Sequence, residues 1–183
     1  IDEVAFFDRS LSAVEIGALY ETAEITPVLD SPPLSPTRSL KKVQVPKGYK
    51  IELVANEPLV KDPVAIDWSN DGSIWIAEMA DYPSGENGVS GRIVKLVDND
   101  GDHFPDKREV LIDKISFPTG VMSWGRGVII TAGGRILYAE DLNGDGGADL
   151  IEDWFTGFVE DNQQLRVNSL RWGLDGWIYC ASG

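Results

Sequence analysis

Two twelve-residue acidic segments constrain the fold of this chain more than any other feature of its sequence. They are DNDGDHFPDKRE at residues 98–109 and DLNGDGGADLIE at residues 141–152, and they lie 43 residues apart. Each has an oxygen-bearing side chain at positions 1, 3, 5, 9 and 12 and a glycine at position 4. We name them the first and the second acidic loop. Because an echo at a fixed separation indicates a repeated structural unit, the segments around the loops are expected to repeat as well.

Strand-like segments surround both acidic loops in the same order. The first unit has VAIDW and SIWIAEM around the turn residues Asn70, Asp71 and Gly72, then GRIVKLV before the loop and REVLI after it. The second unit repeats this plan with TGVMSWGRGVIITAG, RILYAED and LIEDWF, and a third begins at NSLRWGLDGWIYCASG. A tryptophan precedes the first hairpin of each unit, at positions 68, 124 and 172. The segment YKIELVAN, residues 49–56, also alternates like a strand.

This repeat predicts an all-β fold. A period of about 45 residues with four strands per unit is typical of β-propeller blades, so residues 43–183 are expected to form a partial β-propeller of about three blades, each a four-stranded antiparallel sheet. The alternative is a sandwich of unrelated hairpins. That alternative explains the strands but not the 43-residue echo.

The acidic loops are candidate calcium sites. Ca²⁺ takes six to eight oxygen ligands, and alternate residues of a tightly wound loop can direct carboxylates inward. The flanks are strand-like, which favours a β-hairpin loop over a helix-flanked EF-hand, and position 6 is glycine in only one loop, since His103 stands in the other. Glu109 and Glu152 are then optional ligands, and a metal-free Asx turn is the alternative. The predicted ligands are Asp98, Asp100, Asp102 and Asp106 in the first loop and Asp141, Asn143, Asp145 and Asp149 in the second.

The N-terminal part of the chain has a different character. Residues 1–7 alternate like a strand, and Ser12 with Glu15 forms a capping box that predicts a short helix to about residue 22. The segment IDEVAFFDRSLSAVEIGALY resembles the closing strand and helix of a concanavalin A-like (laminin G-type) jelly-roll domain, which assigns residues 1–24 to the end of such a domain. Residues 25–42 include TPVLDSPPLSPTR, a proline-rich and therefore extended interdomain linker.

Composition and charge exclude several classes of protein. The formal net charge is −14, from 16 basic and 30 acidic residues, and no basic cluster exists that could bind nucleic acid. No apolar run is long enough to span a membrane. The single cysteine, Cys180, lies in the apolar segment WIYCASG and is expected to be a buried structural thiol. The single histidine, His103, lies inside an acidic loop, so no Ser-His-Asp triad can be assembled. Neither end looks like a natural terminus, and we expect a fragment of a longer protein.

Three polar residues are candidates for a catalytic or ligand-facing role. Glu78 and Asp81, in EMADYP, follow the end of a strand, and Arg166, in NQQLRVN, precedes one. In a β-propeller such loops border the central channel. The alternative is that these residues only satisfy loop polarity.

Several longer motifs resemble one family in order. They are EPLVKDPVAIDWSNDGSIWIAEMADYP, GRIVKLVDNDGDHFPDKREVLID, FPTGV and TGFVEDNQQLRVNSLRWGLDGWIY. Together they resemble the propeller of the "membrane-bound dehydrogenase domain" family of planctomycete-type bacteria, which is similar to quinoprotein glucose dehydrogenase-like and NHL-type propellers. The resemblance implies an oxidoreductase acting on a sugar or alcohol, with a c-type haem domain outside this sequence. It carries over no catalytic residue, and a pyrroloquinoline quinone site is not supported.

Two functions follow as expectations. The first is an exported dehydrogenase or electron-transfer protein that carries calcium and acts on a carbohydrate or small-molecule substrate. The second is a non-catalytic glycan-binding or scaffold protein. Calcium loops of this kind suit millimolar extracellular calcium, so an extracytoplasmic location is expected in either case.

Overall fold

The computed structural model describes residues 12–14, 33–85 and 88–183. The chain divides into two compact units, Ile1–Gln44 and Val45–Gly183. In the first unit, Ala13 and Val14 are helical, within the helix that the capping box predicts. The strand expected over residues 1–7, the rest of that helix and the linker up to residue 32 lie outside the described residues.

Helix α2 (Pro36–Leu40) is a short turn of helix within the proline-rich segment. Ser35 precedes it in an extended conformation, and its carbonyl oxygen accepts hydrogen bonds from the N–H groups of Arg38 and Ser39, both at 2.9 Å. Pro36 suits the start of a helix because its φ is already helical and its missing N–H is one that a helix start leaves unpaired. The extended conformation expected of the linker is therefore wrong for these five residues.

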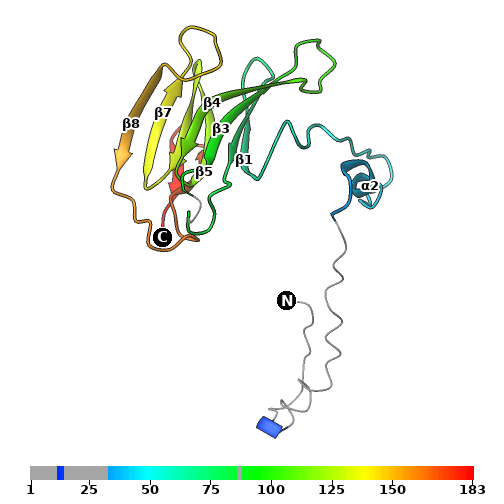
Figure 1. The fold of residues 1–183 in the computed structure, drawn as a ribbon, viewed down its shortest axis with the longest axis horizontal. Coiled ribbons are helices and arrows are strands. Elements are labelled where there is room, and N and C mark those ends of the chain that lie inside the picture. The colour runs from blue at the N-terminus through cyan, green and yellow to red at the C-terminus, as the bar shows by residue number, and fades with distance from the viewer. Residues whose placement is uncertain (1–11, 15–32, 86–87) are drawn as a thin grey trace. The chain divides into compact units, whose positions relative to one another are not determined.

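The second unit is made of three antiparallel sheets, none of them closed (Figure 1). The first sheet contains β1 (Pro63–Trp68), β2 (Ile74–Glu78), β3 (Gly91–Val97) and β4 (Lys107–Ile115). The second contains β5 (Pro118–Trp124), β6 (Gly127–Ala132), β7 (Arg135–Glu140) and β8 (Leu150–Thr156), and the third contains β9 (Asn168–Trp172) and β10 (Ile178–Ala181). Strands that follow one another within a sheet are hydrogen-bonded neighbours. The predicted all-β class is confirmed, and so are the four strands predicted for each of the first two sequence repeats.

Two clusters of buried apolar side chains place the sheets face to face in chain order, and a third covers the outer face of the first sheet. Ile93 of the first sheet and Leu137 of the second belong to one cluster, and neither is exposed at all. Ile136 of the second sheet and Leu170 of the third belong to another. Leu59 and its neighbours cover the other face of the first sheet. Strands β2 and β6 are covered on both faces, so they are buried along their whole length and do not alternate between buried and exposed positions.

The connections lie at two ends of the sheets. The β1–β2, β3–β4, β5–β6, β7–β8 and β9–β10 turns share what we call the acidic-loop end, and Figure 1 shows both acidic loops projecting there. The β2–β3, β4–β5, β6–β7 and β8–β9 connections share the opposite end, which we call the crossover end.

Two expectations are wrong. Residues 49–56 form no strand in the described chain, although they alternate, and Ala55 packs instead against the outer face of the first sheet. Alternation shows only which residues can face a core, whereas a strand also needs a partner for its backbone groups. Cys180 is exposed rather than buried, because β10 is an edge strand of a two-stranded sheet and most of its residues face solvent.

Candidate functional site

The acidic loops occupy equivalent places in the first two sheets. The first connects β3 to β4, and the second connects β7 to β8, so each joins the third strand of a sheet to the fourth. In both cases the fourth strand is the edge of the sheet. This is the hairpin position that the sequence predicts, and strands rather than helices flank both loops.

The two loops also share their hydrogen bonds. Asp98 accepts the N–H of Gly101 on Oδ1 at 2.7 Å and the N–H of His103 on Oδ2 at 2.8 Å. Asp141 accepts the N–H groups of Gly144 and Gly146 in the same way, at 2.7 and 2.8 Å. Four more backbone N–H groups, at positions 2, 5, 7 and 9, have equivalent acceptors in the two loops. The two loops, which repeat in the sequence, therefore also share a backbone conformation.

Positions 4 and 6 of each loop have left-handed backbone conformations. At position 4, φ is 80° at Gly101 and 83° at Gly144. At position 6, φ is 95° at Gly146 and 74° at His103. The histidine thus adopts the conformation that glycine adopts in the second loop, at a cost of about 1–2 kcal/mol for a residue with a Cβ. The departure of His103 from the glycine pattern does not change the path of the chain.

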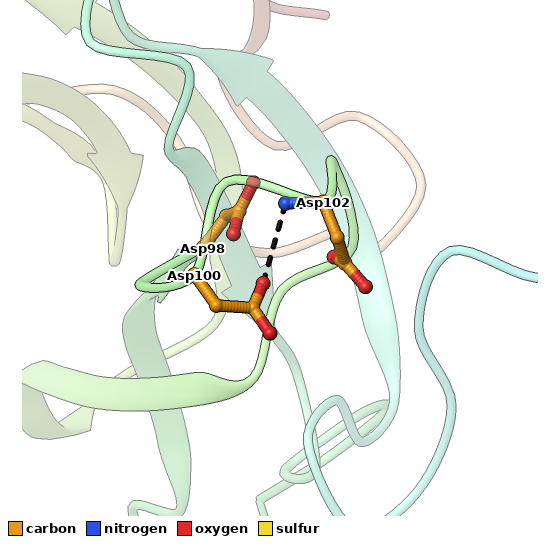
Figure 2. Close-up of side chains that lie close together, drawn as sticks. All are labelled: Asp98, Asp100 and Asp102. Carbon is orange, nitrogen blue, oxygen red and sulfur yellow. Dashed lines mark hydrogen bonds between the residues drawn. The ribbon is translucent and has the colours of Figure 1, made fainter.

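Three carboxylates of the first loop converge. Asp98, Asp100 and Asp102 each offer an oxygen, and these oxygens lie within 4.8 Å of one another (Figure 2). The N–H of Asp102 donates to Asp100 Oδ1 at 3.2 Å, which ties two of the three together (Figure 2). In the second loop Asn143 replaces the central carboxylate, and its Oδ1 accepts the N–H of Asp145 at 2.8 Å.

Backbone donors stabilise the ionised form of the leading carboxylate in each loop. The N–H of Gly101, followed by that of His103, lowers the pKa of Asp98 below its usual value. The N–H groups of Gly146 and Gly144 lower the pKa of Asp141 in the same way. Both negatively charged groups lie close to further carboxylates. A bound cation would offset that charge.

The residues present fit a hard divalent cation. All the predicted side-chain ligands are carboxylate or amide oxygens, which Ca²⁺ prefers. A carboxylate has about four acceptor positions, so one N–H bond on each oxygen leaves room for a metal. The aspartates at position 9 already accept a hydrogen bond from a side-chain amide. Asp106 accepts that of Asn99 at 2.7 Å, and Asp149 accepts that of Asn143 at 2.9 Å, so a metal ion would share these carboxylates with the amides.

The second loop also contacts the first sheet. The N–H of Ala148 donates to the carbonyl oxygen of Leu111 in β4 at 2.9 Å. Glu109, at position 12 of the first loop, pairs with Lys107 at 2.7 Å, and its Cβ lies 3.3 Å from where a Cβ at Gly146 would be. The second loop therefore connects β7 to β8 and also joins the second sheet to the first.

Glu78 is part of a buried ion pair. Its side chain is 2% exposed, its Oε2 lies 2.7 Å from Nη2 of Arg108, and its Oε1 accepts the N–H of Lys61 at 2.8 Å. These contacts tie β2 to β4 and to the segment that covers the first sheet. Nothing in the sequence singled out Arg108 as the partner of Glu78.

The structure brings Asp81 and Arg166 to one residue, Phe117, at the crossover end. Asp81 accepts the N–H of Phe117 at 2.9 Å, and the guanidinium of Arg166 lies 3.6 Å from the centre of the Phe117 ring. Phe117 has a φ of 44°, and Arg166 also pairs with Glu160 at 3.2 Å. Asp81 and Arg166 are both buried, and Asp81 Oδ1 and Arg166 Nη1 have no hydrogen-bond partner among the residues that the structure describes. Sequence reasoning missed Phe117 and Glu160.

Comparison with known protein families gives one match. Residues 35–183 match the family described as "Domain of unknown function (DUF7133)". The chain belongs to this family. No match was found among curated proteins or among solved structures. Within the described ranges, no helix is long and apolar enough to cross a membrane.

Proposed function

We propose that Val45–Gly183 is part of a calcium-binding β-propeller in which each four-stranded sheet is a blade. Each acidic loop holds a structural Ca²⁺ ion at the hairpin between the third and fourth strands. The observation that carries this proposal is the equivalence of the two loops, which have the same backbone hydrogen bonds and the same left-handed positions 43 residues apart.

Each side-chain ligand has a defined part in this proposal. Asp98, Asp100, Asp102 and Asp106 hold the ion of the first loop, and Asp141, Asn143, Asp145 and Asp149 hold that of the second. The carbonyl groups of Phe104 and Gly147, at position 7, supply main-chain oxygens. The ion offsets the repulsion between neighbouring carboxylates and so stabilises the hairpin.

Thermal melting with and without calcium tests this role. The double substitution Asp100→Ala and Asp145→Ala removes one carboxylate from each loop. The unsubstituted protein should melt at a higher temperature in calcium chloride than in EDTA, whereas the double variant should melt at the same temperature in both. Asp161→Ala, an exposed aspartate outside the loops, is the matched control and should keep the calcium response. Identical melting of the unsubstituted protein in calcium and EDTA would contradict the proposal.

Glycan binding is the activity that we propose for this calcium-stabilised domain. The three candidate catalytic residues each contact another part of the fold. Glu78 pairs with Arg108, Asp81 accepts the N–H of Phe117, and Arg166 lies over the ring of Phe117. This favours a recognition surface over a catalytic centre built from these residues. The resemblance of residues 1–24 to a concanavalin A-like domain supports the same class of ligand.

Oxidoreductase activity is the second candidate. It is favoured by buried atoms of Asp81 and Arg166 at the crossover end that lack a hydrogen-bond partner in the described part of the chain. A c-type haem would lie outside this sequence, and electrons from a sugar or alcohol would leave through it. The test is a reduced-minus-oxidised visible spectrum of the full-length native protein. Sharp c-type haem bands would support this candidate, and their absence from intact protein would refute it.

We further propose an extracytoplasmic location, which rests on the calcium loops because weak calcium sites need millimolar calcium. Fractionation of the producing cell tests it, and recovery of the protein in the cytoplasmic fraction would refute it.

A further inference from the structure

The first strands of the three sheets lie in order beside one another and border a cavity at the acidic-loop end. Strand β5 contacts both β1 and β9. The cavity has a volume of about 460 Å³, within the range of about 300–1,000 Å³ that is usual for small-ligand sites. Its lining includes Asp67, Trp68, Asn70, Ser123, Arg171 and Trp172.

Two indole side chains of this lining are largely exposed. Trp68 at the end of β1 is 59% exposed, and Trp172 at the end of β9 is 56% exposed. Trp172 stacks on Trp124, with ring centres 5.5 Å apart and an angle of 25° between the planes. Trp124 therefore braces one face of Trp172 and holds its ring in place. Large exposed aromatic surfaces beside a cavity are typical of binding sites.

The polar lining is held by the fold and offers both donors and acceptors. Asp67 Oδ2 accepts the N–H of Ser123 at 2.7 Å, which fixes this carboxylate between β1 and β5. Asn70 lies exposed in the β1–β2 turn. Arg171 is exposed on β9, and one of its nitrogens donates to the carbonyl oxygen of Leu170 at 3.1 Å, which leaves further N–H groups for a ligand.

We infer that this cavity binds a neutral carbohydrate, with Trp68 and Trp172 as the surfaces against which sugar rings stack. A sugar ring has an apolar C–H face that matches an indole and hydroxyl groups that both donate and accept hydrogen bonds. Asp67, Asn70 and Arg171 provide the complementary groups. This inference rests on the glycan-binding function proposed above and gives that function a site. It does not depend on calcium.

Charge favours a neutral ligand over an anionic one. The chain has a formal net charge of −14. Trp68 and Asn70 also line a neighbouring cavity, whose other wall includes Asp98 of the first acidic loop. Inside the lining, the charges of Asp67 and Arg171 offset each other. A phosphate or a uronic acid would therefore meet net repulsion, whereas a neutral sugar would not.

Affinity electrophoresis in native gels tests the site. The gels contain hydroxyethylcellulose, arabinoxylan or galactomannan as neutral probes and polygalacturonate as the acidic probe. The unsubstituted chain should be retarded by at least one neutral probe. Trp68→Ala and Trp172→Ala should each weaken the apparent affinity at least tenfold. Trp177→Ala is the matched control, since Trp177 is 72% exposed but is not part of this lining.

The outcomes separate the site from the function. Retardation that is lost in both variants and kept in the control supports the inference. Retardation that survives in Trp68→Ala and Trp172→Ala overturns this site and leaves glycan binding standing, whereas no retardation by any neutral probe overturns both. Stronger retardation by polygalacturonate overturns the ligand class. If a lower melting temperature shows that Trp172→Ala disturbs the fold, Trp68→Ala and Asn70→Ala, both at exposed positions, replace it in the test. Loss of retardation in these two variants then supports the site, and unchanged retardation overturns it.

Discussion

Removal of Arg108 should destabilise this protein far more than neutralisation of its partner Glu78. The two side chains form an ion pair with a 2.7 Å contact, but Glu78 is 2% exposed and Arg108 is 18% exposed. In Arg108→Met, Glu78 keeps the N–H of Lys61 but loses its counter-charge, so a buried carboxylate is left without compensation. Such a loss costs about 3–5 kcal/mol of unfolding free energy.

Glu78→Gln should cost less, about 1–2 kcal/mol. The amide oxygen still accepts the N–H of Lys61, and the remaining guanidinium of Arg108 is exposed enough to be partly hydrated. The double variant should be more stable than Arg108→Met alone, because it carries no uncompensated buried charge.

Urea unfolding followed by circular dichroism at neutral pH measures these differences, provided that the midpoints shift while the denaturant dependence stays constant. A loss of less than about 1 kcal/mol in Arg108→Met, or a larger loss in Glu78→Gln than in Arg108→Met, would refute the reasoning from burial.

Two further perturbations test local features of the acidic-loop end. Gly146→Ala should cost about 1–2 kcal/mol in urea unfolding, because φ is 95° there and the new Cβ would lie 3.3 Å from that of Glu109; unchanged stability would contradict this. Partial burial alone would raise the pKa of Asp71, but hydrogen bonds from Ser73 and the charge of Lys95 outweigh it and lower the pKa from 3.8 to about 2. Because the folded-state pKa lies below the unfolded value, this stabilisation is present above about pH 4 and is lost as the pH falls towards 2. Asp71→Asn should therefore reduce the fall in stability over that interval, and an unchanged pH profile would rule this out.

The strands of both full sheets could be predicted because their signals are local. The segment GRIVKLV coincides with β3, Gly91–Val97, and the turn at Asn70, Asp71 and Gly72 joins β1 to β2 as expected. Turn residues and apolar runs depend on a few neighbours along the chain. Residues 49–56 show the limit of such signals, since they alternate like a strand but form none. Their conformation depends on which surface is available to cover.

The candidate sites also differ in whether their residues come from one stretch of chain or from several. Each acidic loop lies within one stretch of chain, so its hairpin position could be predicted from its residue spacing and its strand-like flanks. The partners of Glu78, Asp81 and Arg166 come from other strands and connections, and no spacing in the sequence brings them together. The cavity at the ends of β1, β5 and β9 likewise draws its lining from three sheets.

The sequence by itself determined the all-β class, the order of the strands and the two equivalent acidic loops. Each of these depends on turn chemistry and on the periodicity of side chains over a short stretch of chain. Only the tertiary structure decided that Glu78 is a buried ion-pair partner, that Asp81 and Arg166 meet at Phe117, and that the second acidic loop docks on β4. The physical reason is that burial and ion pairing depend on which surfaces pack together, and those surfaces come from segments far apart in the chain.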